Sequence, residues 1–251
     1  MANKMNIFLE ADCTTYTAFC PVYSPGGRLT SVEMLTHFTH AGSHLAMPQE
    51  IMTALLNDRQ RVLLLQQQIN LLDKHSDFFS NHEIKVAINI DMPLARTILE
   101  SEFILKKMRQ LDCIELEISE SFPGLNAGRD NSILLALSEK FNLSLNNYGA
   151  GKTTSKAVFD DLFYRIKLDR GFIQHNIKRL SFHPFISAIL DHVKPHCQEI
   201  VIQGADDLPS LQKVRDYPFD GIQSALFPSV CEDELMLLTQ SPVPLRERVL
   251  Q

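Results

Sequence analysis

The stretch that decides the fold reads Leu145-Asn146-Asn147-Tyr148-Gly149-Ala150-Gly151. Two asparagines end a short apolar run, and a glycine-rich turn leads into a segment with helical spacing. The turn continues as Lys-Thr-Thr and so resembles a phosphate-binding loop, but that motif needs a glycine where Asn146 stands. We therefore interpret the region as the end of a strand that carries two neutral amides, followed by a turn into a helix.

On both sides of this stretch, short β-rich runs alternate with longer helical ones. We predict strands at residues 16–23, 30–38, 84–90, 113–118, 143–147, 164–168, 199–203 and 220–223. The first two are separated only by Ser-Pro-Gly-Gly at residues 24–27, which is typical of a hairpin turn and leaves no room for a crossover helix. The later strands are separated by helix-length segments, so we expect them to pair in parallel.

Helical spacing is clearest at residues 59–79, where an apolar stripe is formed by Val62, Leu65, Ile69 and Leu72. We expect the three glutamines at 66–68 and Lys74 on the opposite, solvent-facing side of this helix. Further helices are predicted at residues 93–111, 131–140, 182–192 and 208–214. The pattern predicts an α/β fold, a (β/α)8 TIM-like barrel with an antiparallel first strand, as one domain over residues 1–251.

The overall composition limits the function classes. The formal charge is −6 and the basic residues are scattered, so the basic face that a direct DNA binder needs is not evident. The apolar run at residues 7–9 is too short for a signal peptide, and no stretch approaches the ~20 apolar residues that span a bilayer. We therefore expect a cytoplasmic protein with no direct DNA binding and no membrane association.

Cysteine and histidine spacing does not predict a metal site. The five cysteines are odd in number and contain no Cys-x-x-Cys pair, so we interpret them as reduced thiols: Cys13, Cys20, Cys113, Cys197 and Cys231. His37, His40 and His44 are loosely spaced among Thr and Ser residues, which is more typical of solvated or packing histidines than of metal ligands.

Several segments resemble, in order, the motifs of the EAL family, the phosphodiesterases that open the bacterial second messenger cyclic di-GMP. Residues 31–38, Ser-Val-Glu-Met-Leu-Thr-His-Phe, are similar to that family's Gly-Tyr-Glu-Ala-Leu-Leu-Arg-Trp. Residues 87–91 resemble Ser-Val-Asn-Leu-Ser, and residues 116–120 resemble Leu-Glu-Ile-Thr-Glu. The matches run from about Phe19 to Phe227, so the resemblance implies a barrel of EAL type over nearly the whole chain.

Carried over residue by residue, the resemblance implies that metal-binding positions are kept at Glu33, Asn89 and Glu117. It implies a loop-supporting carboxylate at Glu120 and, at Lys167, the lysine that helps to hold the attacking water. A further polar residue of the family's site is kept, Gln223.

The chain departs from the family at the positions that carry the chemistry. In place of the family's two metal-binding aspartates, this chain has Asn146 and Asn147, and in place of the catalytic glutamate it has Gln203. His37 replaces the arginine that grips substrate phosphate, and Ser224 replaces a glycine near the end of the alignment. An amide keeps almost the shape of a carboxylate but lacks its charge.

These replacements predict the loss of enzyme activity. Two-metal phosphodiester hydrolysis uses paired cations to form the nucleophile and to neutralise the transition state. Magnesium prefers carboxylate oxygens, so three amides are poor substitutes. We expect no catalytic residue, metal or cofactor, and a vestigial site at Glu33, Asn89, Glu117, Glu120, Asn146, Asn147, Lys167, Gln203 and Gln223. Without metals, Lys167 suits a structural salt bridge with Glu33 and Glu117.

The chain resembles, along much of its length, a subgroup of degenerate EAL-like proteins of enteric bacteria, for example at residues 114–131 and 156–163. That resemblance implies an anti-activator that binds the FlhD subunit of the flagellar master regulator FlhDC and represses flagellar genes and motility. Two alternatives stay open: a residual cyclic di-GMP phosphodiesterase and a non-hydrolysing cyclic di-GMP receptor. Both are weakened by the amides and by His37, so we do not expect cyclic di-GMP as a ligand. The interface residues are not evident from the sequence.

Overall fold

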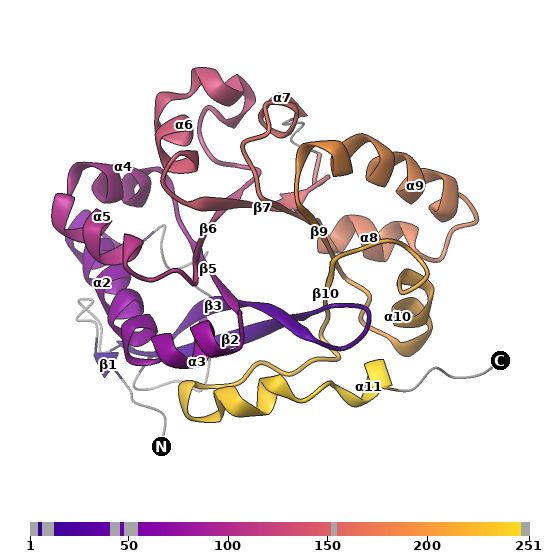
Figure 1. Cartoon of the computed structure of the whole chain (residues 1–251), viewed down its shortest axis with the longest axis horizontal. Coiled ribbons are helices and arrows are strands. Elements are labelled where there is room, and N and C mark those ends of the chain that lie inside the picture. Colours follow the sequence, from indigo (N-terminus) through magenta and orange to yellow (C-terminus); the bar gives the residue numbers. More distant parts are fainter. Residues whose placement is uncertain (1–4, 7–12, 41–45, 48–54, 152–154, 247–251) are drawn as a thin grey trace.

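The chain is represented by a computed structural model, which describes residues 5–6, 13–40, 46–47, 55–151 and 155–246. Its centre is a closed barrel (Figure 1). Within the described residues, the barrel strands are β2 (Cys13–Tyr23), β3 (Leu29–His40), β5 (Lys85–Asn89), β6 (Ile114–Ser119), β7 (Asn142–Tyr148), β8 (Arg165–Leu168), β9 (Glu199–Gln203) and β10 (Gly221–Gln223). The barrel closes because β2 pairs with both β3 and β10, in each case antiparallel. The predicted barrel with an antiparallel first strand is confirmed.

The hairpin between β2 and β3 depends on its turn. Ser24 and Arg28 bond through their backbones, and the Gly27 amide donates to the Ser24 carbonyl at 2.8 Å. Gly27 has a φ of +85°, and a Cβ there would lie 2.0 Å from the Ser241 hydroxyl oxygen. A glycine is therefore required both by the turn and by the C-terminal segment that packs on it. Two short strands, β1 (Met5–Asn6) and β4 (Ala46–Met47), extend the hairpin and were not predicted.

Helices surround the barrel on its outer side (Figure 1). They are α2 (Asp58–Lys74), α3 (Ser76–Asn81), α4 (Met92–Glu100), α5 (Glu102–Arg109), α6 (Ser132–Ser138), α7 (Ser155–Phe159), α8 (Arg170–Asn176), α9 (Phe182–Val193), α10 (Leu208–Val214) and α11 (Val243–Arg246). Three 3₁₀ segments accompany them: η1 (Leu125–Asp130), η2 (Lys194–His196) and η3 (Glu232–Thr239). No helix in this described part of the chain combines the length and apolarity needed to cross a membrane.

Two predicted helices are each divided in the structure. The helix expected at residues 59–79 ends at His75, where the backbone leaves the helical region before α3 begins. The helix expected at residues 93–111 breaks at Ser101, which is extended and caps α5 by accepting from the Ile104 amide. Apolar periodicity continues across both breaks, because a single capping residue interrupts the backbone without changing which faces are buried.

The face assigned to Gln68 was also wrong. Gln68 is buried, and its amide donates to the Thr36 hydroxyl at 3.2 Å. It follows Leu64 by four residues and Leu65 by three, so helical geometry places all three on the inner side of α2. The polar side chain is accommodated there because it finds a hydrogen-bond partner on the barrel.

The C-terminal segment covers the hairpin that has no helix of its own. It runs along β2, as Figure 1 shows at the lower edge of the molecule. The Tyr23 hydroxyl donates to the Leu238 carbonyl at 3.0 Å, and Phe19 and Val230 bond through their backbones. Lys74 on α2 forms an ion pair with Glu232 at 2.8 Å. The outer surface of the antiparallel first strand is thereby packed like that of the other strands.

Candidate functional site

Polar side chains from seven strands meet inside the barrel at the carboxyl ends of the parallel strands. Alternate residues of a strand face opposite sides, so on β6 both Glu115 and Glu117 face inward, as do Arg165 and Lys167 on β8. All four are almost completely buried. The resulting cluster contains seven of the residues expected at the site: Glu33, Asn89, Glu117, Asn146, Lys167, Gln203 and Gln223.

Lys167 lies between the two carboxylates of this cluster. Its ammonium nitrogen is 2.7 Å from Glu33 Oε2, and 3.0 and 2.9 Å from the two oxygens of Glu117. The Asn89 amide donates to the other Glu33 oxygen at 3.0 Å. The ammonium therefore stands where a cation would contact both carboxylates, as expected for a structural ion pair.

The amides complete a closed circuit of hydrogen bonds. Asn146 donates to Glu117 Oε1 at 2.5 Å, and Gln203 donates to Asn146 Oδ1 at 3.4 Å and to Gln223 Oε1 at 2.9 Å. Gln223 donates to Glu33 Oε2 at 3.0 Å. We call this circuit the polar ring, which consists of Glu33, Lys167, Glu117, Asn146, Gln203 and Gln223. Two of its members, Asn146 and Gln203, are amides at positions where the resemblance to the EAL family implies metal-binding or catalytic carboxylates.

The two carboxylates of the polar ring have opposite pKa shifts. Burial acts to raise the pKa of Glu33, but the Lys167 charge and the donated hydrogen bonds prevail and lower it to about 2. Burial and the Glu33 charge raise the pKa of Glu117 to about 8, against the effect of Lys167. Burial acts to lower the pKa of Lys167, but both carboxylates raise it. One ammonium cannot neutralise two buried carboxylates, so ionisation of Glu117 is disfavoured once Glu33 is charged.

Two expected site residues lie outside the polar ring. Asn147 has an exposed side chain and a φ of +60°, and its backbone amide donates to Asn146 Oδ1 at 2.9 Å. Glu120 follows β6 and accepts from the Gly149 amide at 3.4 Å, which fits a carboxylate that supports the loop. Lys152, the lysine of the apparent phosphate-binding loop, lies outside the described residues.

The two other departures from the family have structural partners. The His37 ring stacks on Tyr16 across the hairpin, with ring centroids 4.9 Å apart and an angle of 15° between the planes. The Ser224 hydroxyl donates to the Ala205 carbonyl at 2.6 Å. Neither side chain enters the polar ring. The side chain of His40, and all of His44, lie outside the described residues.

The polar ring does not suit a pair of metal ions. A metal ligand must offer lone pairs, but the amide N–H groups of Asn146 and Gln223 donate into the carboxylates, and Lys167 uses the same oxygens. In the part of the chain that the structure describes, no group of three or more His, Cys, Asp or Glu side chains is arranged to hold a metal. The polar atoms of the ring are therefore arranged as a hydrogen-bonded ion pair and not as ligands of a metal ion.

A second ionic cluster, missed in the sequence, lies one layer deeper in the barrel. Arg165 is 3.0 Å from Glu115 Oε1 and 2.8 Å from Glu199 Oε2, and the Tyr164 hydroxyl donates to Glu199 at 3.2 Å. Burial raises the pKa of Glu115 despite Arg165. The signal that could have revealed this cluster is a spacing of two residues, because residues two apart on a strand face the same side of the sheet. Arg165 precedes Lys167 by two residues, and Glu115 precedes Glu117 by two. Charged layers replace the apolar filling usual in such barrels.

Known proteins resemble this chain in sequence and structure. The model of the EAL domain family matches residues 5–227. The YdiV protein of Escherichia coli (strain K12) is 36% identical over 236 residues, which cover 94% of this chain and 100% of that protein. The anti-FlhC(2)FlhD(4) factor YdiV of Salmonella typhimurium (strain LT2) is 31% identical over 222 residues, which cover 88% and 94%.

The structural comparison agrees with the sequence comparison. The crystal structure of the EAL-like domain protein YdiV superimposes with a TM-score of 0.86 at 35% identity, over 93% of this chain and 100% of that one. The family model, the full-length relatives and the barrel point to the same assignment. This chain belongs to the EAL domain family.

Proposed function

We propose that this chain is a catalytically inactive EAL-like protein that binds the FlhD subunit of the FlhDC flagellar activator and represses flagellar gene expression and motility. The observation that carries the inactive half is the polar ring, in which Lys167 and the amides use the carboxylate oxygens that metal ions would need. The nine vestigial residues named from the sequence then serve the fold. The activity resides in one EAL-like domain that acts in the cytoplasm, where a transcription activator works.

The partner is supported by the relatives. The Salmonella proteins carry the name anti-FlhC(2)FlhD(4) factor, and they match this chain over nearly their full length. The net charge of −6 fits a partner that itself needs a basic surface to bind DNA, although charge alone selects no particular partner. FlhD is the proposed contact within the FlhDC complex.

The direct test is co-elution. We expect purified protein mixed with FlhDC at micromolar concentrations to elute as a complex from a sizing column, and its overexpression to reduce swimming motility. Separate elution of the two at these concentrations would refute the anti-activator function. A monomeric EAL domain from an enzyme unrelated to motility serves as the control, and it should elute separately from FlhDC at the same concentrations.

The two alternatives are tested with cyclic di-GMP. We expect no linear dinucleotide product with Mg²⁺ or Mn²⁺ above that of a Glu33→Ala control, because the ring lacks the charge for two metals. We also expect no heat of binding in isothermal titration, since His37 is stacked on Tyr16 and offers no arginine-like grip on phosphate. Turnover would restore the phosphodiesterase alternative, and micromolar binding would restore the receptor alternative.

A further inference from the structure

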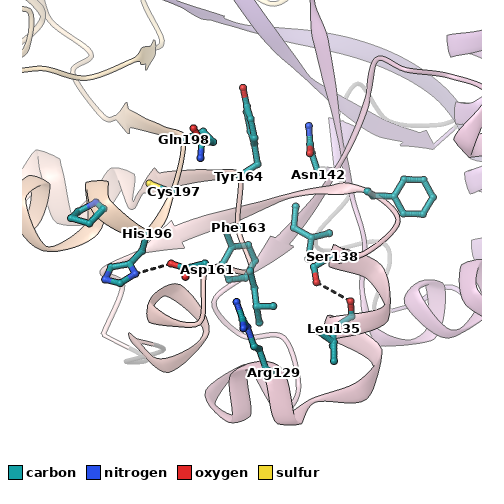
Figure 2. Close-up of a pocket in the computed structure, with 14 residues that line it drawn as sticks. Arg129, Leu135, Ser138, Asn142, Asp161, Phe163, Tyr164, His196, Cys197 and Gln198 are labelled. Carbon is teal, nitrogen blue, oxygen red and sulfur yellow. Dashed lines mark hydrogen bonds and ion pairs between the residues drawn. The ribbon is translucent and has the colours of Figure 1, made fainter.

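A cavity of about 420 Å³ lies at the end of the barrel opposite the polar ring. It is lined by the first residues of parallel strands and by the residues just before them, among them Asn142, Tyr164 and Gln198 (Figure 2). Asn142 begins β7, whereas Asn146 of the polar ring lies near the end of the same strand. The two sites are therefore separated by roughly 13 Å, the rise of four strand residues.

Two surface segments that are bonded to each other border this cavity, through Arg129 and Asp161. We call them the η1–α7 platform, which consists of residues 125–130 and 155–161. Lys156 donates to the Ala127 carbonyl at 2.7 Å and pairs with Asp160 at 2.9 Å and Asp130 at 3.2 Å. The Arg129 backbone amide and Nε donate to Asp160 at 2.8 Å each.

A glycine is required for this contact. Gly128 has a φ of +59°, and a Cβ added there would lie 2.0 Å from Asp160 Oδ2. The contacts are largely exposed, and exposed ion pairs contribute little to stability. Their effect is to hold two segments, 31 residues apart at Arg129 and Asp160, in one fixed arrangement. A surface that is already ordered loses less conformational entropy when a partner binds.

The platform presents groups that remain available to a partner. Phe159 is 47% exposed, with its ring edge against His196 at a centroid distance of 5.0 Å. Arg129 lies at the cavity (Figure 2), and its terminal nitrogens make no hydrogen bond among the residues the structure describes. The side chains of Asn142 and Gln198 are exposed at the rim. The cavity lining mixes polar side chains with apolar ones, among them Leu162 and Phe163.

We infer that the η1–α7 platform and its cavity form the surface on which FlhD docks, an inference that rests on the proposed function. The inference predicts that FlhD presents an exposed apolar side chain that enters the cavity and, next to it, a carboxylate that pairs with Arg129. The side-chain amides of Asn142 and Gln198, at the rim of the cavity, are expected to form hydrogen bonds with the FlhD peptide groups that lie between that apolar side chain and that carboxylate. Aromatic and arginine anchors carry most of the energy in protein interfaces, and Phe159 and Arg129 supply one of each.

One further observation favours this surface. The polar ring at the other end offers a partner little, because its charges are buried and already paired. A specific interface buries at least about 1,000 Å² in total, so FlhD must contact the platform as well as fill the cavity.

The inference is tested by measuring the affinity of FlhDC for variants of the full chain by titration calorimetry. We expect Phe159→Ala and Arg129→Glu each to weaken binding by about thirtyfold, as hot-spot residues do. Gly128→Ala is expected to weaken it as well by separating the two segments. The matched controls are Met236→Ala, 60% exposed on η3 along β2, and Arg59→Glu at the exposed start of α2. Circular dichroism and thermal unfolding verify that every variant is folded.

The outcomes separate this inference from the proposed function. Weakened binding by the platform variants, with unchanged binding by the controls, supports the platform. Tight binding by the natural protein and all platform variants overturns the platform and leaves the anti-activator function intact. Failure of the natural protein to bind FlhDC overturns both. A photo-crosslinking phenylalanine analogue at position 159 is expected to capture FlhD, and capture of FlhD only from position 236 would contradict the platform.

Discussion

The polar ring and the η1–α7 platform both consist of ion pairs and hydrogen bonds, but they differ in burial. Lys167 is 2% exposed with two buried carboxylates around it, whereas the Lys156 side chain is 48% exposed. A buried charge without a partner is strongly unfavourable, so the ring must be satisfied internally and offers nothing to a ligand. An exposed cluster has water as an alternative partner, and this leaves Phe159 and Arg129 available for contacts with another protein.

The largest expected effect follows from removing the cation of the ring. Lys167→Met leaves Glu33 and Glu117 buried beside each other, which is expected to lower the free energy of unfolding by about 3–5 kcal/mol. Lys156→Met, in the platform, is the matched control and should leave stability nearly unchanged. Urea unfolding of both variants measures the difference. Equal, small losses would show that the ring charges are solvated and would remove the contrast between the two regions.

The pH dependence of stability distinguishes the two ring carboxylates. The pKa of Glu117 is raised from 4.5, its value in the unfolded chain, to about 8 in the folded protein. The folded state is therefore progressively destabilised as the pH rises from 4.5 towards 8. Glu117→Gln should therefore gain stability relative to the natural protein over this range, by up to a few kcal/mol at about 1.4 kcal/mol per pKa unit. Urea unfolding at a series of pH values measures the slope.

Glu33 provides the control of opposite sign. Its pKa is lowered to about 2, so its contribution is present above pH 4.5 and is lost as pH falls from 4.5 towards 2. Glu33→Gln should lose stability at neutral pH and become less sensitive to acid. If both variants showed the same pH slope as the natural protein, the assignment of charge within the ring would be wrong.

Restoring carboxylates should make the ring respond to metal. With Asn146→Asp, Asn147→Asp and Gln203→Glu combined, a new carboxylate faces Glu117 where an amide now donates at 2.5 Å. We expect a lower melting temperature without metal and a recovery of about 1–3 kcal/mol in millimolar Mn²⁺, by linkage to binding. The natural protein, measured in parallel, should show no such recovery. A metal response in the natural protein would contradict the interpretation of the ring as a metal-free ion pair.

The smallest expected effect is that of the ring on partner binding. Gln203→Ala removes two donated hydrogen bonds at the mouth of the barrel. Because the platform lies at the other end, the affinity for FlhDC should change by less than about twofold, as is usual for distant sites. Titration calorimetry measures the affinity of both Gln203→Ala and Arg129→Glu for FlhDC, and the second variant shows how large a loss at the interface is. A large loss of affinity with Gln203→Ala would place the interface at the end of the barrel that carries the polar ring.

Most of the fold could be predicted because strands and turns leave local signals. All eight predicted strands exist, and the hairpin at Ser24 is confirmed. The errors lie where a single residue decides: His75 and Ser101 interrupt helices whose apolar spacing continues, and Gln68 is polar yet buried. Periodicity reports which face of an element is apolar, and it is insensitive to one capping residue or to one hydrogen-bonded amide.

The site was only partly predictable for a similar reason. The resemblance to the EAL family identified the residues of the polar ring, and the ion pair of Lys167 was expected from the loss of metals. The cluster around Arg165 and the platform were missed. Their partners are distant in the chain, as Arg165 is 50 residues from Glu115 and Arg129 is 31 from Asp160. No local pattern reports such contacts.

The sequence by itself determined that the chain folds as an EAL-type barrel and that amides stand at three positions where the resemblance to the EAL family implies carboxylates. Both follow from residue identity and order, since alternation, turns and side-chain charge are properties of the chain. Only the tertiary structure decided that Asn146, Gln203 and Gln223 close a circuit around Lys167, and that Gly128 allows η1 to meet α7. Those outcomes depend on distances and directions between residues far apart in sequence, which exist only once the barrel has closed.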